Sequence, residues 1–143
     1  TYYAYYTVDD ILDEITAYTF ATVEQFKNST GCGAIYTRLY KAGVEIDPLL
    51  STVFSTTAPT SPSNGDYYYK LDETNDTCTL MKYNGSTWAS ENENYTYTYK
   101  YYRIDQNGNS LDTATAYATA RCIYVDPGII QGRMQFVCEV SGD

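Results

Sequence analysis

The chain contains no histidine, few cations and no long apolar run. Without histidine it lacks the commonest general base and an important zinc ligand. Nine lysines and arginines stand against 18 aspartates and glutamates, and the net charge of −9 repels phosphate backbones and anionic membrane surfaces. No stretch approaches the roughly 18 apolar residues of a membrane helix. The composition therefore disfavours an enzyme, a nucleic-acid-binding protein and a membrane protein, and it predicts no cofactor.

The segment from Asp105 to Asp112 is the best candidate for a metal site. Two aspartates and two asparagines alternate through it, as in the opening of an oxygen-ligand calcium loop. The segment has serine where such a loop needs glycine and alanine where it needs the final glutamate. Asparagine and glycine at 107–108 are also what a hairpin turn requires. We therefore expect a plain turn, and we assign neither a catalytic residue nor a metal ligand.

The four cysteines, Cys32, Cys78, Cys122 and Cys138, are too widely spaced for a zinc site. Cys122 and Cys138 fall on the apolar faces of two expected strands. One interpretation joins these two in a disulfide. The other leaves them as buried free thiols that pack like small hydrophobic side chains.

Tyrosine is the abundant residue, at 18 of 143 positions. Tyr95, Tyr97, Tyr99 and Tyr101 alternate, and residues two apart share one face of an extended strand. Tyrosine offers a large contact area and keeps a polar hydroxyl at its tip. The row is either core beneath another layer or, if uncovered, a surface that meets another polypeptide. The second interpretation makes this row, together with Trp88, a candidate interface.

Residues 1–7 form an aromatic arm ahead of the first expected element. The arm contains four tyrosines: Tyr2, Tyr3, Tyr5 and Tyr6. It is too short to form a domain and too aromatic to be left in water, so we expect it to reach onto a neighbouring copy. Because the chain starts at Thr1, we expect that an initiator methionine or a longer leader has been removed.

The first third of the chain reads as helical. Apolar residues from Val8 to Phe26 recur about every 3.6 residues, and acidic residues crowd the first turns, where the helix dipole favours them. Asp47-Pro48 is typical of a helix start, with a capping residue followed by proline. The expected helices cover residues 8–28, 34–42 and 48–54. Together they would form a helical layer over residues 8–54.

The rest of the chain reads as antiparallel sheet, after a Pro/Ser/Thr-rich linker at residues 55–65. Asn84-Gly85, Asn107-Gly108 and Asp126-Pro127-Gly128 are turn signals, and we expect the last to be a type II turn. The expected strands are residues 66–70, 79–83, 94–104, 113–125 and 130–140. The sequence thus predicts a single α+β domain over residues 1–143, with N-terminal helices followed by an antiparallel β-meander of about five strands over residues 66–143.

Residues 58–88 carry a specific motif. It begins Ala-Pro-Thr-Ser-Pro-Ser-Asn-Gly-Asp-Tyr-Tyr-Tyr and ends Leu-Met-Lys-Tyr-Asn-Gly-Ser-Thr-Trp. This resembles a short hairpin module that recurs in bacteriophage tail, fibre and other virion proteins. The resemblance implies a β-hairpin in a virion protein, closed by Trp88 as a hydrophobic plug, and names no activity.

A second resemblance concerns the order of the expected elements. A long N-terminal helix, a four-stranded antiparallel sheet and a C-terminal cysteine pair are similar to the soluble part of a type IV pilin or pseudopilin. Such subunits begin with a long apolar helix, whereas this chain begins with tyrosines. The resemblance implies a secreted filament subunit.

The favoured function is a non-enzymatic structural subunit of a bacteriophage particle, in its tail, neck or fibre apparatus. The expected location is the virion. The expected partners are copies of the chain and other virion proteins, with a host-surface glycan or protein as a further candidate, but neither nucleic acid nor membrane. One alternative is a secreted cell-surface filament or adhesin of pilin type, and another is a small carbohydrate-binding module. Free thiols would favour assembly in a reducing cytoplasm, and disulfides would favour secretion.

Overall fold

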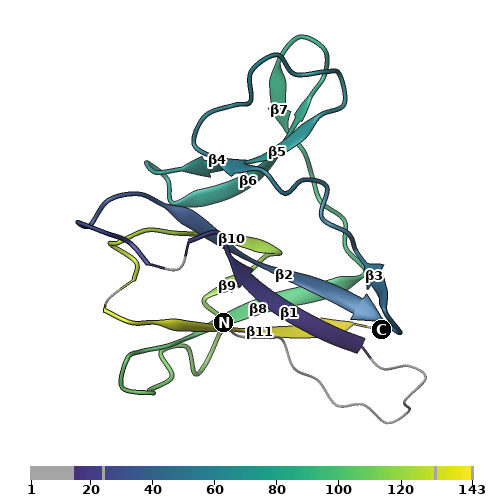
Figure 1. The fold of residues 1–143 in the computed structure, drawn as a ribbon. Helices are drawn as coiled ribbons and strands as arrows, with labels where there is room; N and C mark the ends of the chain where they lie inside the picture. Colours follow the sequence, from purple (N-terminus) through teal and green to yellow (C-terminus); the bar gives the residue numbers. More distant parts are fainter. Residues whose placement is uncertain (1–14, 24, 131, 143) are drawn as a thin grey trace.

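The computed structural model describes residues 15–23, 25–130 and 132–142, and every regular element in them is a β-strand (Figure 1). The strands are β1 (Ile15–Ala21), β2 (Gly33–Lys41), β3 (Val44–Ile46), β4 (Phe54–Ser55), β5 (Tyr67–Asp72), β6 (Thr77–Tyr83), β7 (Trp88–Ser90), β8 (Tyr97–Ile104), β9 (Ala118–Thr119), β10 (Cys122–Val125) and β11 (Gln135–Gly142). They form three sheets. Sheet A contains β1, β2, β3 and β10, sheet B contains β4 to β7, and sheet C contains β8, β9 and β11.

The expected α+β class is wrong, because the described part of the chain is mostly β. Residues 15–23 and 25–28 of the first expected helix contain β1, and residues 8–14 lie outside the described residues. The second expected helix is β2, and residues 48–54 are irregular up to the start of β4. In β1 the buried and exposed side chains alternate with a period of two, which is the period of a strand and not of a helix.

Sheets A and C pack face to face around the main core. Their inward side chains are aliphatic and aromatic: Ala17, Ile35, Leu39, Tyr99, Tyr101, Ile123, Val125, Phe136, Cys138 and Val140. Sheet C keeps one pairing of the expected meander, that of β8 with β9, but β11 pairs antiparallel with β8 and not with the strand that precedes it. In Figure 1, β8 and β11 lie side by side next to the strands of sheet A.

The remainder of the meander is wrong, because β10 leaves the C-terminal sheet. β10 pairs with β2 in sheet A, so Asp126-Pro127-Gly128 connects two sheets instead of joining a hairpin. The backbone N–H groups of Ile129 and Ile130 both donate to the carbonyl of Asp126, and Gly128 lacks the positive φ of a type II turn. All four residues of β10 are buried, and a strand that is apolar on both faces needs cover on both.

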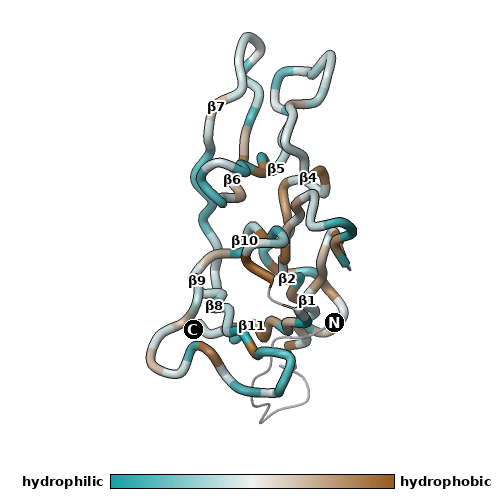
Figure 2. Tube along the Cα trace, turned by 90° about the vertical axis from the view of Figure 1, so that its left-hand side faces the viewer, coloured by the Kyte–Doolittle hydropathy of each residue, from teal (hydrophilic) through white to brown (hydrophobic). Residues whose placement is uncertain are grey.

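Sheet B supplies that second cover (Figure 2). The hydrophobic segments of β2 and β10 lie between sheet B on one side and sheet C on the other. Tyr69 and Leu80 of sheet B pack on Cys122, and Leu71 packs on Tyr124. The expected hairpin of residues 66–70 and 79–83 is confirmed as β5 and β6. Trp88 packs on it, with ring centroids 4.8 Å from Tyr68 and 5.2 Å from Tyr83.

Candidate functional site

The alternating tyrosine row is core and not surface. Tyr99 and Tyr101 are 2% and 0% exposed, and Tyr95 and Tyr97 are partly buried against the same cluster. Sheet A is the layer that covers them. The Tyr101 hydroxyl donates to the carbonyl of Arg121 at 2.5 Å and lies 2.9 Å from the Thr37 hydroxyl. Tyr99 and Tyr101 therefore fix the packing of sheet C on sheet A and are not available to a partner.

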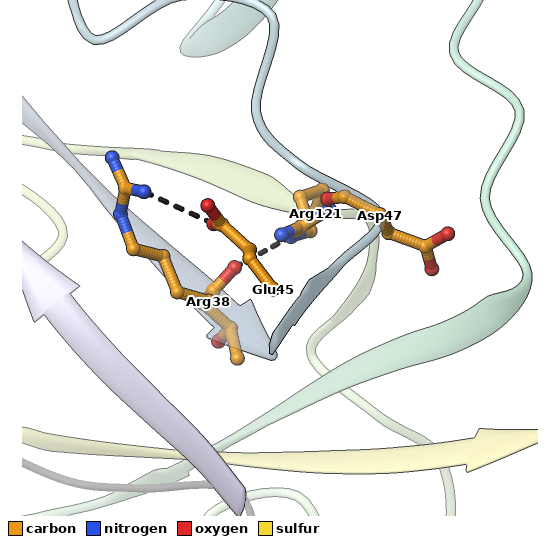
Figure 3. A network of polar contacts seen from close by, with 5 residues as sticks. Arg38, Glu45, Asp47 and Arg121 are labelled. Atoms are coloured by element: carbon orange, nitrogen blue, oxygen red, sulfur yellow. Dashed lines mark hydrogen bonds and ion pairs between the residues drawn. The ribbon is translucent and has the colours of Figure 1, made fainter. Parts of the chain in front are cut away.

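Arg121 lies at the centre of this packing and was not singled out by the sequence. The residue is 2% exposed. Its Nε donates to the carbonyl of Thr37 and its Nη1 to the carbonyl of Asp47, both at 2.5 Å (Figure 3). The guanidinium carbon lies 4.8 Å from the ring centroid of Tyr95 and 4.6 Å from that of Tyr99, which are cation–π distances. Arg121 is thus held by carbonyl groups and aromatic rings.

Two carboxylates border the arginine site. Asp47 accepts hydrogen bonds from the backbone N–H groups of Thr96 and Tyr97 and from the Tyr99 hydroxyl. Burial by itself would raise the pKa of Asp47, but these hydrogen bonds outweigh it and hold the pKa below its usual range. Glu93 accepts from the Tyr69 hydroxyl at 2.6 Å, and burial raises its pKa against the opposing effects of that hydroxyl and of Arg121. These contacts tie the loops flanking β3 and β8 to the core.

The outward face of β1 and β2 is aromatic and partly open. Tyr18 and Phe20 are 49% and 37% exposed. The ring of Tyr18 packs edge-on against that of Tyr40, with centroids 5.9 Å apart, and Phe20 stacks on Tyr36 at 5.4 Å. We call this surface, made of Tyr18, Phe20, Tyr36 and Tyr40, the aromatic face. It arises because alternate residues of two paired strands point to the same side.

A continuous stack of rings connects the aromatic face to sheet B. Phe20 stacks on Tyr36, Tyr36 on Phe54 at 5.1 Å, and Phe54 on Tyr69 at 4.8 Å. The four rings come from β1, β2, β4 and β5, so the stack runs from an exposed edge strand to a fully buried tyrosine. Stacked aromatic rings therefore join sheet B to sheet A. Rings of the same kind on the aromatic face are partly exposed to solvent.

One ion pair lies beside these rings. Arg38 Nη1 is 3.0 Å from Glu45 Oε2, and both side chains are about a quarter exposed (Figure 3). The register of β2 against β1 and β3 places Arg38 opposite Tyr18 and Glu45 opposite Tyr40, on the outward side. Since the two charges cancel, this part of the surface carries no net formal charge on a chain whose net charge is −9.

The remaining candidate residues are dispersed. Trp88 lies on sheet B, and the four arm tyrosines, Tyr2, Tyr3, Tyr5 and Tyr6, lie outside the described residues. Cys122 and Cys138 are buried free thiols in different clusters, as the second of the two interpretations has it, and they are not joined in a disulfide. Burial raises the pKa of Cys138 to about 11.

The Asp105 to Asp112 segment forms a turn held by its own side chains. The Asp105 carboxylate accepts the backbone N–H groups of Asn107 and Asn109, each at 2.9 Å. Asp112 forms a two-pronged pair with Arg103, at 3.0 Å from Nε and 2.8 Å from Nη2, and this pair lowers the pKa of Asp112. In residues 15–23, 25–130 and 132–142, no group of three or more metal-ligating side chains gathers.

An open groove of about 720 Å³ lies between the ends of β1 and β11. Apolar side chains such as Phe20 and Phe136 and polar ones such as Gln25 and Gln135 line it together, and Arg133 is the one charged group among its described lining residues. The described lining residues include no carboxylate or thiol that could act as a nucleophile, an acid or a base. No described helix is both long and apolar enough to span a bilayer.

Comparison with known proteins gives no related protein whose function could be compared with the aromatic face. The chain matches no family model, no curated protein and no solved structure.

Proposed function

We propose that the chain is a non-enzymatic structural subunit of a bacteriophage particle, in its tail, neck or fibre apparatus, that assembles through the aromatic face. The observation that carries this proposal is the exposure of Tyr18 and Phe20 on paired strands whose neighbouring rings are already stacked. Exposed aromatic clusters of this kind are enriched where proteins meet other proteins.

The occupant of the aromatic face is a second copy of the chain. The strand that carries Tyr18 and Phe20 is an edge strand, because β1 pairs only with β2 among the described strands. An edge strand offers unpaired backbone N–H and C=O groups that another strand can extend. Like-charged copies approach most easily where the Arg38–Glu45 pair leaves the surface neutral. Contact between two copies would thus combine strand pairing with aromatic packing.

The hairpin of sheet B adds support of a different kind. Residues 58–88 resemble the virion module, which implies a β-hairpin, and β5 pairs antiparallel with β6 in this segment. Trp88 closes the unit against Tyr68 and Tyr83. Assembly through sheet A leaves the outer end of sheet B free to meet other virion proteins.

Sedimentation velocity over a wide concentration range tests the proposal. We expect the wild-type chain to form defined oligomers as concentration rises, and the double variant Tyr18→Ser/Phe20→Ser to remain monomeric, because it removes the two exposed rings of β1. Leu111→Ser is the matched control: Leu111 is 44% exposed but lies in the loop between β8 and β9. Its oligomers should resemble those of the wild type.

A folded wild-type chain that sediments as a monomer at every concentration would contradict self-assembly. Equal loss of oligomers in the Leu111→Ser variant would contradict the role of the aromatic face. Negative-stain electron microscopy of the oligomer tests the particle itself: rings, tubes or fibres are expected of a virion subunit, whereas closed dimers would argue against it.

The alternatives stand differently. The pilin-type proposal depended on a long N-terminal helix, which the described residues do not contain, and on a C-terminal cysteine pair, whose members Cys122 and Cys138 are free thiols in different clusters. The carbohydrate-binding proposal is favoured by one observation, since exposed rings beside a polar ion pair can stack on a sugar. Binding of a monomer to a glycan array, abolished by Tyr18→Ser/Phe20→Ser, would favour that function over assembly.

A further inference from the structure

Three of the four cysteines gather where sheet B packs on sheet A. Cys122 of β10 is 6% exposed, and Cys78 of β6 packs against it in the cluster that also holds Tyr69 and Leu80. Cys32 and Cys78 both border the neighbouring cluster around Tyr124. Cys138 is separate from this group, in the core between sheets A and C.

Cys78 is the cysteine that packs against the cluster containing Cys122. The two side chains come from β6 and β10 and meet in one apolar cluster where sheet B packs on sheet A. Burial, and then the neighbouring Cys78, raise the pKa of Cys122 well above its usual value. All four cysteines are free thiols in the structure.

We propose that Cys78 and Cys122 form a latent disulfide site that closes when the protein meets an oxidising environment. The cross-link would tie β6 of sheet B to β10 of sheet A. It would convert a contact made only by packing into a covalent one. This inference does not depend on the proposed function, although a particle subunit made in a reducing cytoplasm and released from the cell passes through just such a change.

The oxidant is a small-molecule disulfide, for which glutathione disulfide is the probe. The partly exposed Cys78 attacks first as its thiolate, so the S–S bond of the probe breaks and one glutathione thiolate leaves. The Cys122 thiolate then attacks the Cys78 sulfur and displaces the second glutathione. Two protein thiols lose two protons and two electrons in total, and one glutathione disulfide becomes two glutathione thiols. Alkaline pH should speed closure, because Cys122 must first deprotonate.

Closure should stabilise the protein by restricting the unfolded chain. The two cysteines are 44 residues apart in sequence (122 minus 78), so the cross-link closes a long loop. A loop of that length predicts a rise in melting temperature of roughly 10 °C for a chain of this size.

Peptide mapping tests the proposal directly, because trypsin places each cysteine in a separate peptide. The peptides are residues 28–38, 71–82, 122–133 and 134–143. The full chain is incubated with glutathione disulfide at alkaline pH, its remaining thiols are alkylated, and the digest is analysed by mass spectrometry with and without reductant. We expect peptide 71–82 to be cross-linked to peptide 122–133, with Cys32 and Cys138 alkylated.

Variants separate this pair from its neighbours. Cys32→Ser/Cys138→Ser should still form the cross-link and show the higher melting temperature on oxidation. Cys78→Ser, which changes the more accessible partner, should lose both. A cross-link between peptides 28–38 and 71–82, a glutathione adduct that persists on Cys78, or alkylation of all four cysteines after oxidation would each overturn the proposal.

Discussion

At the scale of single residues, the core contains a buried arginine that has no ion-pair partner among the described carboxylates. Arg121 is held instead by the carbonyls of Thr37 and Asp47 and by the rings of Tyr95 and Tyr99. Its Nη2 has no hydrogen-bond partner among the described residues. A buried polar group is tolerated only where its other contacts compensate for lost hydration, so the four surrounding groups fix its position.

Arg121→Ala should lower the free energy of unfolding by about 3–5 kcal/mol, because it removes the guanidinium donors from the carbonyls of Thr37 and Asp47 and opens a cavity between two rings. Urea denaturation followed by circular dichroism measures the change. Arg133→Ala, at an exposed position, is the matched control and should stay within about 0.5 kcal/mol of the wild type. A loss at Arg121 no larger than that of the control would show that the arginine does not hold the sheets together.

Asp47 makes stability depend on pH. Its pKa is lowered in the folded state, so the stabilisation is complete above its usual value of 3.8 and is lost as pH falls below it. Glu93 acts in the opposite sense, since its raised pKa adds stability at low pH that is lost as pH rises through the folded value. The two carboxylates therefore oppose each other between acidic and neutral pH.

Asp47→Asn should make stability less dependent on pH in the acidic range, because asparagine carries no charge that protonation could remove. Melting temperatures measured from about pH 7 to about pH 3 should fall less in this variant than in the wild type. Asparagine also tolerates the φ of 49° at this position. The exposed Asp76→Asn, with a φ of 56°, is the control and should keep the wild-type slope. Parallel curves for Asp47→Asn and the wild type would exclude a role for Asp47.

At the scale of elements, residues four apart in sequence explain why helices were expected. Ile35 and Leu39 share a face in a helix, but they share one in a strand as well, because four is a multiple of two. Ile15 and Tyr18 distinguish the two cases: a helix would place them together, whereas β1 places Ile15 toward the core and Tyr18 toward solvent. Threonine, isoleucine and tyrosine within both segments favour strands, and that signal could have corrected the prediction.

The two Asn-Gly turns and the first hairpin could be predicted because their signals are local, whereas the turn expected at Asp126-Pro127-Gly128 proved to be a connection between sheets. Gly85 and Gly108 have φ angles of 96° and 83°, the left-handed region that Asn-Gly turns use. The departure of β10 into sheet A could not be predicted from its neighbours. Its partner is β2, far away in sequence, and only its burial on both faces indicates a central position.

Phe54 is the ring that joins sheet B to sheet A, and removing it should weaken that junction. Phe54→Ala breaks contacts with both Tyr36 and Tyr69 and should cost about 2–3 kcal/mol of stability, less than for a fully buried phenylalanine. Trp88 is the one tryptophan of the chain and lies on sheet B, so its fluorescence in urea reports this unit. Val53→Ala, at a position 46% exposed, is the control. Unchanged unfolding of Phe54→Ala would mean that the ring stack does not anchor sheet B.

At the scale of the whole molecule, the three sheets bury the rings of Tyr99 and Tyr101 and leave those of Tyr18 and Phe20 exposed. The sequence drew attention to residues 95–101, which sheet A covers. The aromatic face lies on β1 and β2, which were expected to be helices. The alternation of buried and exposed side chains that creates this face was therefore missed. Which of two tyrosine-rich strands is covered depends on long-range packing, and composition alone does not contain that information.

The central claim is that the outward face of β1 and β2 is where copies of this chain meet. Hydrogen exchange, compared between the concentrated and the dilute chain, tests it most directly, because strand pairing and aromatic packing both slow exchange of the backbone amides. The account predicts slower exchange in residues 15–21 at high concentration, and no such change in the Tyr18→Ser/Phe20→Ser variant. Protection that grows only in sheet B or sheet C, with β1 exchanging equally fast at both concentrations, would contradict it.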